Sequence, residues 1–359
     1  MSQKNTYDFD EVAKYQKKIK EEIEKGNLNL DLIPLPKDSN PAVRNYLKKW
    51  LFQIKHFSLK DIFPGPHEEI IFHSGDVVQV IYQNQTIQAG SDLTNEILEL
   101  AIQYLCLKNS VDWNLKNPFV SFKVSIDQTE YRTSLIHSRA GIEPYGKYFF
   151  RKIAAHPFSL GDFGPNATEL GQSYADYKTI VIAGSTGSGK TTLATSLIQQ
   201  TSQEDHIILI EDTEELIAPH QNTTRLLAHK YNGYGLNDYM TYAMRMSPKR
   251  IVLGEMRAKE IEAYLLALNC GHKGLVTTVH ANSAEDAIAR MTILYQFHCQ
   301  AKIEYPVIHK MIASHIDEVV FMENKSITEH IRVLGSNGES LFYKNIIEEK
   351  TNRRTAQDH

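Results

Sequence analysis

One stretch of nine residues has the composition of a loop that holds a polyanion. Residues 184–192 have the sequence GSTGSGKTT, in which glycines alternate with hydroxyl side chains and a single lysine. The apolar segment KTIVIA before it predicts a strand, and LATSLIQQ after it predicts a helix. Glycines let successive backbone N–H groups turn inward on an anion, and the helix N-terminus adds partial positive charge. This pattern predicts a phosphate-binding loop for a nucleoside triphosphate.

Two residues of this loop have distinct expected tasks. Lys190 can reach the β- and γ-phosphates, and the hydroxyl of Thr191 can ligate Mg²⁺. The sequence contains no feature that selects ATP over GTP. The residues expected to contact the phosphates are Gly184, Ser185, Thr186, Gly187, Ser188, Gly189, Lys190, Thr191 and Thr192.

Two further apolar segments end in carboxylates. HIILIEDTEELI delivers Glu211, with Glu214 and Glu215 just beyond, and RIVLGE delivers Glu255. Ligands of parallel α/β sheets bind at the carboxyl ends of the strands, where a carboxylate can orient or deprotonate an attacking water. The alternative for Glu211, Glu214 and Glu215 is that they cap a following helix.

A histidine follows a third apolar segment. His280 comes after GLVTTV, where it can hydrogen-bond the γ-phosphate; a core or capping histidine is the alternative. A zinc site is the alternative for the wider set of ligand-type residues, but their spacing matches no familiar zinc motif and no CxxC occurs. That set is Cys270, His272, His280, His298 and Cys299.

The bulk composition limits the class of protein. The chain has 359 residues, of which 42% are hydrophobic, enough for two cores. Its net charge of -4 gives no whole-chain basic footprint of the kind common in nucleic-acid binders. Three scattered cysteines favour a reducing compartment. No apolar run of about 18 residues and no secretory signal are present, so we expect a soluble cytoplasmic protein.

The hydrophobic periodicity divides the chain into two domains. Residues 1–155 are expected to form an α+β domain, with leading helices over 8–25 and 41–60, a helix capped by Ser91 or Asp92, and strands at FVSFKVSI, YRTSLIHS and KYFFRKI. For the leading helices, a solvated surface is favoured over contact with a partner or a membrane.

A second domain follows a segment rich in turn-forming residues. Residues 156–173 have the composition of a linker. Residues 174–359 alternate strand and helix, which predicts a parallel α/β sheet, and they include a C-terminal hairpin that turns at Ser336-Asn337-Gly338-Glu339. The tail TNRRTAQDH is expected to be disordered.

Four motifs taken together resemble a known superfamily. GSTGSGKTT, LIEDTEEL, IVLGEMR and GHKGLVTTVHANS, in this order, are similar to the ATPases of type II secretion, type IV secretion and type IV pili. The likeness covers most of residues 120–320. RMSPKRIVLGEMR and TTVHANSAEDAIARM are most similar to the type IV secretion and conjugation branch, and the chain lacks the four-cysteine insert of many type II members. The Gly254-Glu255 strand end matches the superfamily's own variant of the Walker B motif.

This resemblance implies a fold, a cofactor and partners. It implies a PAS-like N-terminal domain, a RecA-like P-loop domain, and a homohexamer on the cytoplasmic face of the inner membrane that hydrolyses ATP with Mg²⁺. Inner-membrane channel and coupling proteins, protein or nucleoprotein cargo and peripheral membrane contact are the implied partners. Arginines of the N-terminal domain approach the γ-phosphate in this superfamily; the matching positions are Arg132 and Arg151, with Arg139 as a third.

Three other functions remain open at this stage. A pilus assembly or retraction motor belongs to the same superfamily. A nucleic-acid motor can use the same RecA-like core, because a fold does not fix a function. A switch that binds nucleotide without hydrolysing it is the third, although Glu211, Glu255 and His280 together argue against it.

Overall fold

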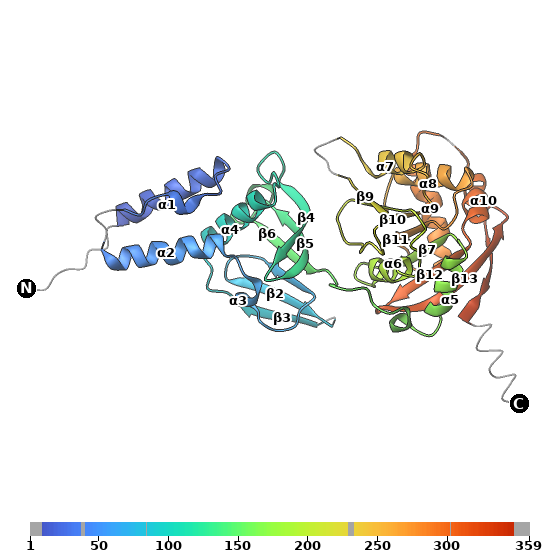
Figure 1. The fold of residues 1–359 in the computed structure, drawn as a ribbon, viewed down its shortest axis with the longest axis horizontal. Helices are drawn as coiled ribbons and strands as arrows, with labels where there is room; N and C mark the ends of the chain where they lie inside the picture. The colour runs from blue at the N-terminus through green and yellow to red at the C-terminus, as the bar shows by residue number, and fades with distance from the viewer. Residues whose placement is uncertain (1–8, 37–39, 84, 229–232, 302, 348–359) are drawn as a thin grey trace, which may run out of the picture. The chain divides into compact units, whose positions relative to one another are not determined.

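The computed structural model describes residues 9–36, 40–83, 85–228, 233–301 and 303–347. The chain divides into two compact units, Met1–Ala155 and His156–His359. Each unit contains its own β-sheet and its own helices (Figure 1). The expected α/β fold class is confirmed.

The described part of the N-terminal unit is an antiparallel sheet with helices on one face. The sheet order is β3-β2-β1-β6-β5-β4. Its strands are β1 (Glu69–Phe72), β2 (Val77–Tyr82), β3 (Gln85–Gly90), β4 (Phe119–Ile126), β5 (Thr129–Ile136) and β6 (Lys147–Lys152). Its helices are α1 (Phe9–Glu24), η1 (Leu30–Leu32), α2 (Pro41–Lys55), α3 (Leu59–Ile62), α4 (Asn95–Lys108) and η2 (Ser138–Ala140).

Helix α4 lies between two apolar layers of this unit. One face of α4 packs on the sheet through Leu98 and Ile102, beside Phe72 and Phe150. Its other face packs with α1 and α2, whose fully buried residues include Ile19, Leu47 and Trp50. The sheet therefore has one face covered by helices of its own unit.

The expected leading helices and strands are present, with two corrections. The second leading helix ends at Lys55 and is followed by the separate turn α3. The cap expected at Ser91 or Asp92 is wrong: the hydroxyl of Thr94 accepts from the N–H of Ile97, and α4 begins at Asn95. Ser91 accepts from the N–H of Leu93 in the preceding loop, because a serine side chain can bond a nearby backbone group in a turn as readily as in a cap.

The described part of the C-terminal unit is a mostly parallel sheet between two helical layers. The order is β14-β13-β12-β7-β11-β10-β8-β9, in which β12, β7, β11, β10, β8 and β9 are parallel neighbours. The strands are β7 (Ile180–Gly184), β8 (Ile207–Glu211), β9 (Thr223–Leu227), β10 (Arg250–Met256), β11 (Val276–Val279), β12 (Glu318–Glu323), β13 (Ser326–Ser336) and β14 (Leu341–Asn345). The helices are η3 (Leu160–Phe163), α5 (Ala167–Ala175), α6 (Lys190–Ile198), α7 (Leu236–Ala243), α8 (Glu260–Asn269), α9 (Ala284–His298) and α10 (Tyr305–His315).

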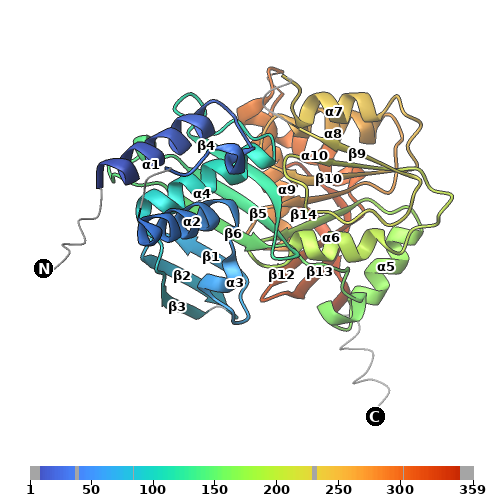
Figure 2. The ribbon, with the colours of Figure 1, turned by 60° about the vertical axis from the view of Figure 1, so that its left-hand side comes forward.

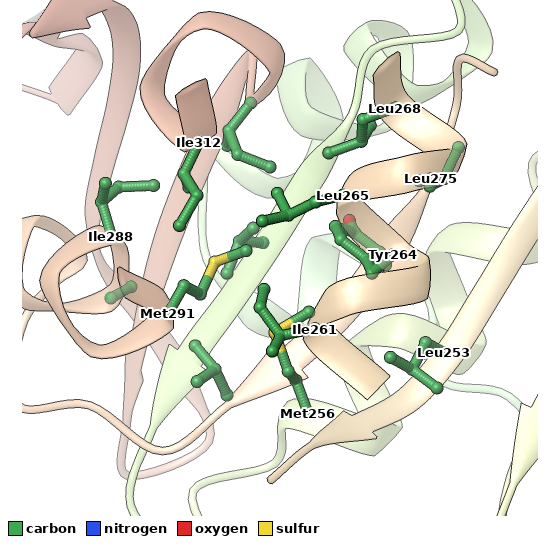
Figure 3. Packing of buried hydrophobic residues seen from close by; sticks show 14 of the residues in the cluster. Leu253, Met256, Ile261, Tyr264, Leu265, Leu268, Leu275, Ile288, Met291 and Ile312 are labelled. Atoms are coloured by element: carbon green, nitrogen blue, oxygen red, sulfur yellow. The ribbon is translucent and has the colours of Figure 1, made fainter. Parts of the chain in front are cut away.

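Both faces of this sheet are buried. Alternate residues of β7 and β8 point to two different cores, because successive side chains of a strand face opposite ways. Figure 3 shows the core on the side of α8, α9 and α10, where Tyr264, Leu265, Met291 and Ile312 pack together. The core on the other side contains residues of α5 and α6 (Figure 2). Burial on both faces explains why these strands are continuous apolar runs.

Most of the stretch predicted as a linker has regular structure. Within residues 156–173, η3 and the start of α5 pack into the core of the C-terminal unit through Leu160, Phe163, Ala167 and Leu170. The glycines and polar residues that indicated a linker lie at helix ends; Gly164, for example, follows η3 with a φ of 106°.

The C-terminal hairpin is confirmed. β13 and β14 pair antiparallel, and Gly338 has a φ of 103° in the turn between them. The tail TNRRTAQDH lies outside the described residues. In the described part of the chain, no helix has the length and apolarity needed to cross a membrane.

A buried ion pair joins the amino ends of the strands. The guanidinium of Arg250 donates from Nε to Oδ2 of Asp205 at 2.7 Å, and the side chains are 2% and 6% exposed. The same guanidinium lies over the rings of Tyr174 and Tyr177, 4.4 and 4.0 Å from their centroids. Arg250 also donates to the carbonyls of Tyr174 and Ala175, which fixes the C-terminal end of α5 to the sheet.

This ion pair predicts a stability effect. Asp205→Ala leaves the guanidinium of Arg250 buried without its carboxylate, so we expect the free energy of unfolding to fall by about 3 kcal/mol. Urea unfolding followed by far-ultraviolet circular dichroism measures it. Asp176→Ala, which removes an exposed carboxylate nearby, is the control and should change the same quantity by less than about 0.5 kcal/mol. Equal effects of the two substitutions would contradict a special role for the pair.

Candidate active site

The phosphate-binding loop has the expected context in the structure. β7 ends at Gly184, and α6 begins at Lys190 with Gly189 as its N-cap. Gly184, Gly187 and Gly189 have φ values of 151°, 78° and 98°, which side-chain-bearing residues rarely adopt. A Cβ added at Gly184 would lie 2.6 Å from the carbonyl oxygen of Met322. Glycine is therefore required here both by backbone conformation and by a neighbouring strand.

The loop holds a buried cation at its centre. Lys190 is 7% exposed, and its Nζ donates to the carbonyl oxygens of Gly184 at 2.9 Å and Ser185 at 2.7 Å. The buried Oγ of Ser188 has no hydrogen-bond partner among the described residues. A buried ammonium and an unsatisfied hydroxyl in one glycine-lined loop fit a bound polyphosphate. Thr191, the residue expected to ligate Mg²⁺, lies in the first turn of α6.

A β-bulge aims Glu255 at the carboxyl edge of the sheet. Between Leu253 and Met256 the register of β10 against β11 shifts by one residue, which places Gly254 and Glu255 in the irregularity. The carbonyl of Gly254 accepts from the hydroxyl of Thr278 at 2.7 Å. A Cβ at Gly254 would lie 3.1 Å from Cγ of Glu211, so a small residue is needed before Glu255.

The structure brings together three of the residues predicted from separate motifs. Nζ of Lys190 lies 3.4 Å from Nδ1 of His280. Nε2 of His280 lies 3.0 Å from Oε1 of Glu255. In the tautomer that satisfies both contacts, Nε2–H donates to the carboxylate and the lone pair of Nδ1 accepts from the ammonium. His280 therefore connects the phosphate-binding lysine to the Walker B carboxylate.

The charges and burial around His280 and Glu255 favour this neutral tautomer of His280. Burial and the nearby ammonium of Lys190 lower the pKa of His280, which favours the neutral ring. Burial raises the pKa of Glu255, but the hydrogen bond and charge of Arg257 and the charge of Lys190 outweigh it, so this pKa lies below its usual range. The carboxylate is therefore ionised beside a neutral imidazole.

Arg257 and Asp212 extend the series of contacts that runs from Lys190 through His280 to Glu255. Neither residue was selected from the sequence. Nη2 of Arg257 donates to Oε2 of Glu255 at 2.5 Å, and Nη1 donates to Asp212. The hydrogen bond that Arg257 donates to Glu255, together with the charges of both carboxylates, holds the pKa of Arg257 above its usual range. The i, i+2 spacing of Glu255 and Arg257 at a strand end is a signal that could have found this arginine, because alternate residues share a face.

Glu211 takes no part in this series of contacts. Its side chain is 6% exposed, and Oε1 accepts from the backbone N–H groups of Glu215 at 2.9 Å and Leu216 at 2.8 Å. Oε2 lies 3.8 Å from Nη2 of Arg225. Burial raises the pKa of Glu211 to about 7, although the two N–H groups and Arg225 act in the opposite direction. Glu211 therefore ties the loop after β8 back to the strand.

The neighbouring acidic residues do not cap a helix. In the described part of the chain, residues 212–222 form a loop that leads to β9, so the helix-capping alternative is wrong. Glu214 pairs with Arg225 at 2.9 Å. The ligand-type residues around Cys270 and His298 make no group of three or more metal ligands within the described residues.

Two of the three predicted arginines of the N-terminal unit, Arg132 and Arg151, lie in one row across its sheet. Arg132 and Arg151 are direct cross-strand partners, flanked by Lys123 on β4 and Glu69 on β1. Nη2 of Arg151 lies 3.1 Å from Oε2 of Glu69. Their strand neighbours, such as Tyr131 and Phe150, face the core, so by alternation the row lies on the opposite face of the sheet.

Arg139 lies away from this row. It is exposed in η2, after the end of β5. There it lines a cavity of about 890 Å³ together with residues of α1 and α4, including Lys20 and Glu99. The three arginines are therefore not one cluster within the N-terminal unit.

Strand order and loop position define the class of protein. β7, which carries the phosphate-binding loop, lies beside β11, and β10 with its acidic end comes next. This is the RecA-like P-loop arrangement. Residues 168–336 match the family described as "Type II/IV secretion system protein". This part of the chain, a little under half of its length, is similar to the type II/IV secretion proteins, and relatives that match it are type IV secretion proteins.

Two relatives illustrate the match in sequence. "Type IV secretion system protein VirB11" of Bartonella quintana is 39% identical over 157 residues, which are 42% of this chain and 44% of that protein. "Protein VirB11" of Agrobacterium fabrum is 36% identical over 148 residues, 40% of this chain and 43% of that protein. The match thus spans less than half the length of these relatives.

Two solved structures share the fold. The pilus retraction motor PilT, solved with bound ADP, has a TM-score of 0.55 and 18% identity, and the match covers 84% of this chain and 86% of PilT. The ATPase DotB of Legionella pneumophila has a TM-score of 0.53 and 17% identity, with 86% of this chain and 81% of DotB covered. At these identities the likeness shows a common fold.

The environment of Glu211 predicts a pH-dependent stability. Its folded-state pKa of about 7 lies above the value of about 4.3 for an unfolded glutamate. The folded state therefore binds this proton more tightly, and the resulting stability is complete below about pH 4.3 and lost as the pH rises towards 7. Glu211→Gln removes the titration but keeps a carbonyl acceptor. We expect the difference in free energy of unfolding, wild type minus variant, to decrease as the pH rises from 5 to 7.

Urea unfolding at pH 5, 6 and 7 measures this difference. The change should not exceed about 1.4 kcal/mol per pH unit, the limit for one proton. Glu204→Gln, an exposed glutamate just before β8, controls for substitution at a solvent-facing position. Parallel curves for wild type and Glu211→Gln would show that Glu211 does not titrate in this way.

Proposed function

We propose that this protein is an ATPase of a bacterial type IV secretion system, converting ATP and water to ADP and phosphate. The observation that carries the proposal is the contact chain from Lys190 through His280 to Glu255. It joins a phosphate-binding lysine to an ionised carboxylate, which is the arrangement needed to hold a terminal phosphate next to an activated water. The type IV secretion proteins among its sequence relatives support the biological setting.

Each residue of the site has a role in this proposal. Lys190 and the loop N–H groups hold the phosphates, and Thr191 would hold Mg²⁺, which would supply positive charge for the phosphate oxygens. Glu255 positions the attacking water. Neutral His280 contacts the γ-phosphate and responds to its loss through its bond to Glu255. Arg257 fixes the carboxylate of Glu255 against Asp212.

Glu211 supports the site in a different way. Because its Oε1 is bonded to the N–H groups of Glu215 and Leu216, it holds the loop that carries Asp212 beside Arg257. Loss of Glu211 would loosen that loop and, through Arg257, the orientation of Glu255.

The N-terminal unit supplies cations in this proposal. Arg132 and Arg151, neighbours on adjacent strands, approach the γ-phosphate and stabilise charge in the transition state; Arg139 is a further candidate contact. This sheet face has three cations, of which Lys123 pairs with Glu130 and Arg151 with Glu69, and its excess of one cation favours an anionic partner.

The proposed assembly is a homohexamer peripheral to the inner membrane. Its partners would be inner-membrane channel and coupling proteins and a protein or nucleoprotein cargo. Helix α2 supports membrane contact: it contains no acidic residue, and Arg44, Lys48 and Lys49 remain cationic besides Lys55, which pairs with Asp31. The exposed rings of Tyr46 and Phe52 accompany these cations, a combination that suits the surface of an anionic bilayer.

Substitution of the two central residues tests the activity. We expect slow ATP hydrolysis by wild type, and a loss of at least about a hundredfold in Lys190→Ala and Glu255→Gln, because these remove the phosphate contact and the water-positioning carboxylate. Phosphate release is the measurement, with light scattering in the presence and absence of ATP and Mg²⁺ to obtain the mass. Glu204→Gln, at the opposite edge of the same sheet, is the control.

The outcomes of this experiment separate the candidate functions. A six-subunit particle whose hydrolysis is lost in both variants supports the proposal. A protein that hydrolyses ATP only when DNA is added would replace it with a nucleic-acid motor. Hydrolysis unaffected by Lys190→Ala would contradict the assigned site.

The arginines predict a separate kinetic effect. Arg132→Ala or Arg151→Ala should lower kcat by on the order of a hundredfold, because guanidinium groups act on charge that develops in the transition state. ADP affinity should change much less. Steady-state kinetics and ADP titration measure the two quantities, with Arg44→Ala on α2 of the same unit as the control. An unchanged kcat in both variants would remove these arginines from the mechanism.

A further inference from the structure

The turn between β12 and β13 lies against the phosphate-binding loop. β12 runs parallel to β7 with Met322 opposite Gly184, so the residues after Met322 continue beside the loop that follows Gly184. Glu323 pairs with Ser326 across the hairpin. Asn324 and Lys325 are the two turn residues between them, with φ values of 51° and 65°.

Three close approaches join this turn to the loop. The backbone N–H of Lys325 donates to the carbonyl oxygen of Ser188 at 3.1 Å. A Cβ added at Gly189 would lie 3.5 Å from Cα and 3.8 Å from Cβ of Lys325. The third approach is that of the Met322 carbonyl to Gly184. Together these contacts place the hairpin along one side of the phosphate-binding loop.

The proposed catalytic groups and the hairpin turn lie on opposite sides of the phosphate-binding loop. β7 lies between β12 and β11. His280 and Glu255 come from β11 and β10, on one flank of the loop, and the hairpin turn comes from β12, on the other. In the proposed function the γ-phosphate lies beside His280 and Glu255. A bound triphosphate therefore directs its α-phosphate and nucleoside towards the flank of the hairpin.

We propose that the β12–β13 turn is the wall of the nucleoside side of the site and that Lys325 binds the α-phosphate through its ammonium group. This inference rests on the proposed function, because it takes the orientation of ATP from it. The stem of Lys325 begins beside Gly189, the N-cap of α6, and a four-carbon stem can carry the ammonium over the helix N-terminus.

The backbone conformation does not account for a lysine at this position. A left-handed turn residue is most easily glycine or asparagine, and Asn324 fits that preference. Lys325 adopts the same region with a long side chain.

The test uses a substitution that cannot act by straining the turn. Lys325→Gly removes the ammonium at a position where glycine is favoured, so the melting temperature should not fall. We expect affinity for ADP and for a non-hydrolysable ATP analogue, both measured by titration calorimetry on the full chain, to fall by the same factor of about ten. An equal loss is expected because both ligands contain the α-phosphate.

Two matched variants separate the charge from the backbone. Asn324→Gly relaxes the same turn without removing a cation and should bind as wild type does. Lys325→Arg keeps the positive charge and should retain most of the affinity. Wild-type affinity in Lys325→Gly overturns the proposal, as does a loss confined to the ATP analogue, which would place Lys325 at the γ-phosphate. An equal loss in Asn324→Gly would also overturn it, because the effect would come from the backbone.

A further variant distinguishes this inference from the proposed function. If wild type binds ADP, Lys190→Ala does not, and Lys325→Gly binds normally, the nucleotide site stands and only the role of Lys325 fails. If wild type binds no nucleotide, the proposed function fails and the inference fails with it.

Discussion

The burial of one ammonium group controls the arrangement of the carboxyl edge of the C-terminal sheet. Lys190 is 7% exposed, and a charge in that position is costly unless polar groups surround it. Two loop carbonyls and the imidazole of His280 meet that need. The contact of His280 with Glu255 has a simple cause. The imidazole that accepts a hydrogen bond from Lys190 has its second nitrogen available to donate to a carboxylate. The contacts from Lys190 through His280, Glu255 and Arg257 to Asp212 thus link the ends of four strands.

Rigid packing around this edge holds these contacting side chains in place. The strands that carry it are buried on both faces, so their ends cannot shift without disturbing two cores. Arg250 anchors the opposite edge by binding Asp205 and the end of α5. A site whose charges must meet within hydrogen-bond distance needs such a scaffold, because small displacements weaken electrostatic contacts steeply.

The N-terminal unit has a different design. Helix α4 covers one face of its antiparallel sheet, and the opposite face displays Arg132 and Arg151 next to each other. Two adjacent guanidinium groups repel unless anions compensate them; Glu69 accounts for one contact with Arg151. A face of this charge suits an anionic ligand.

The sequence by itself determined the phosphate-binding loop and most strands and helices, because these depend on neighbouring residues: glycines where φ is positive, apolar runs where a strand is buried, and Asn337-Gly338 at a hairpin turn. It also identified Glu255 and His280 as residues at strand ends. It misjudged most of the predicted linker, residues 156–173, where helix ends resemble a linker in composition. Only the tertiary structure decided that His280 bridges Lys190 and Glu255, that Arg257 binds Asp212, that Glu211 serves a loop, and that Lys325 lies beside Gly189. These contacts join segments far apart in the chain, and the order of strands that brings them together is fixed by packing of the whole sheet.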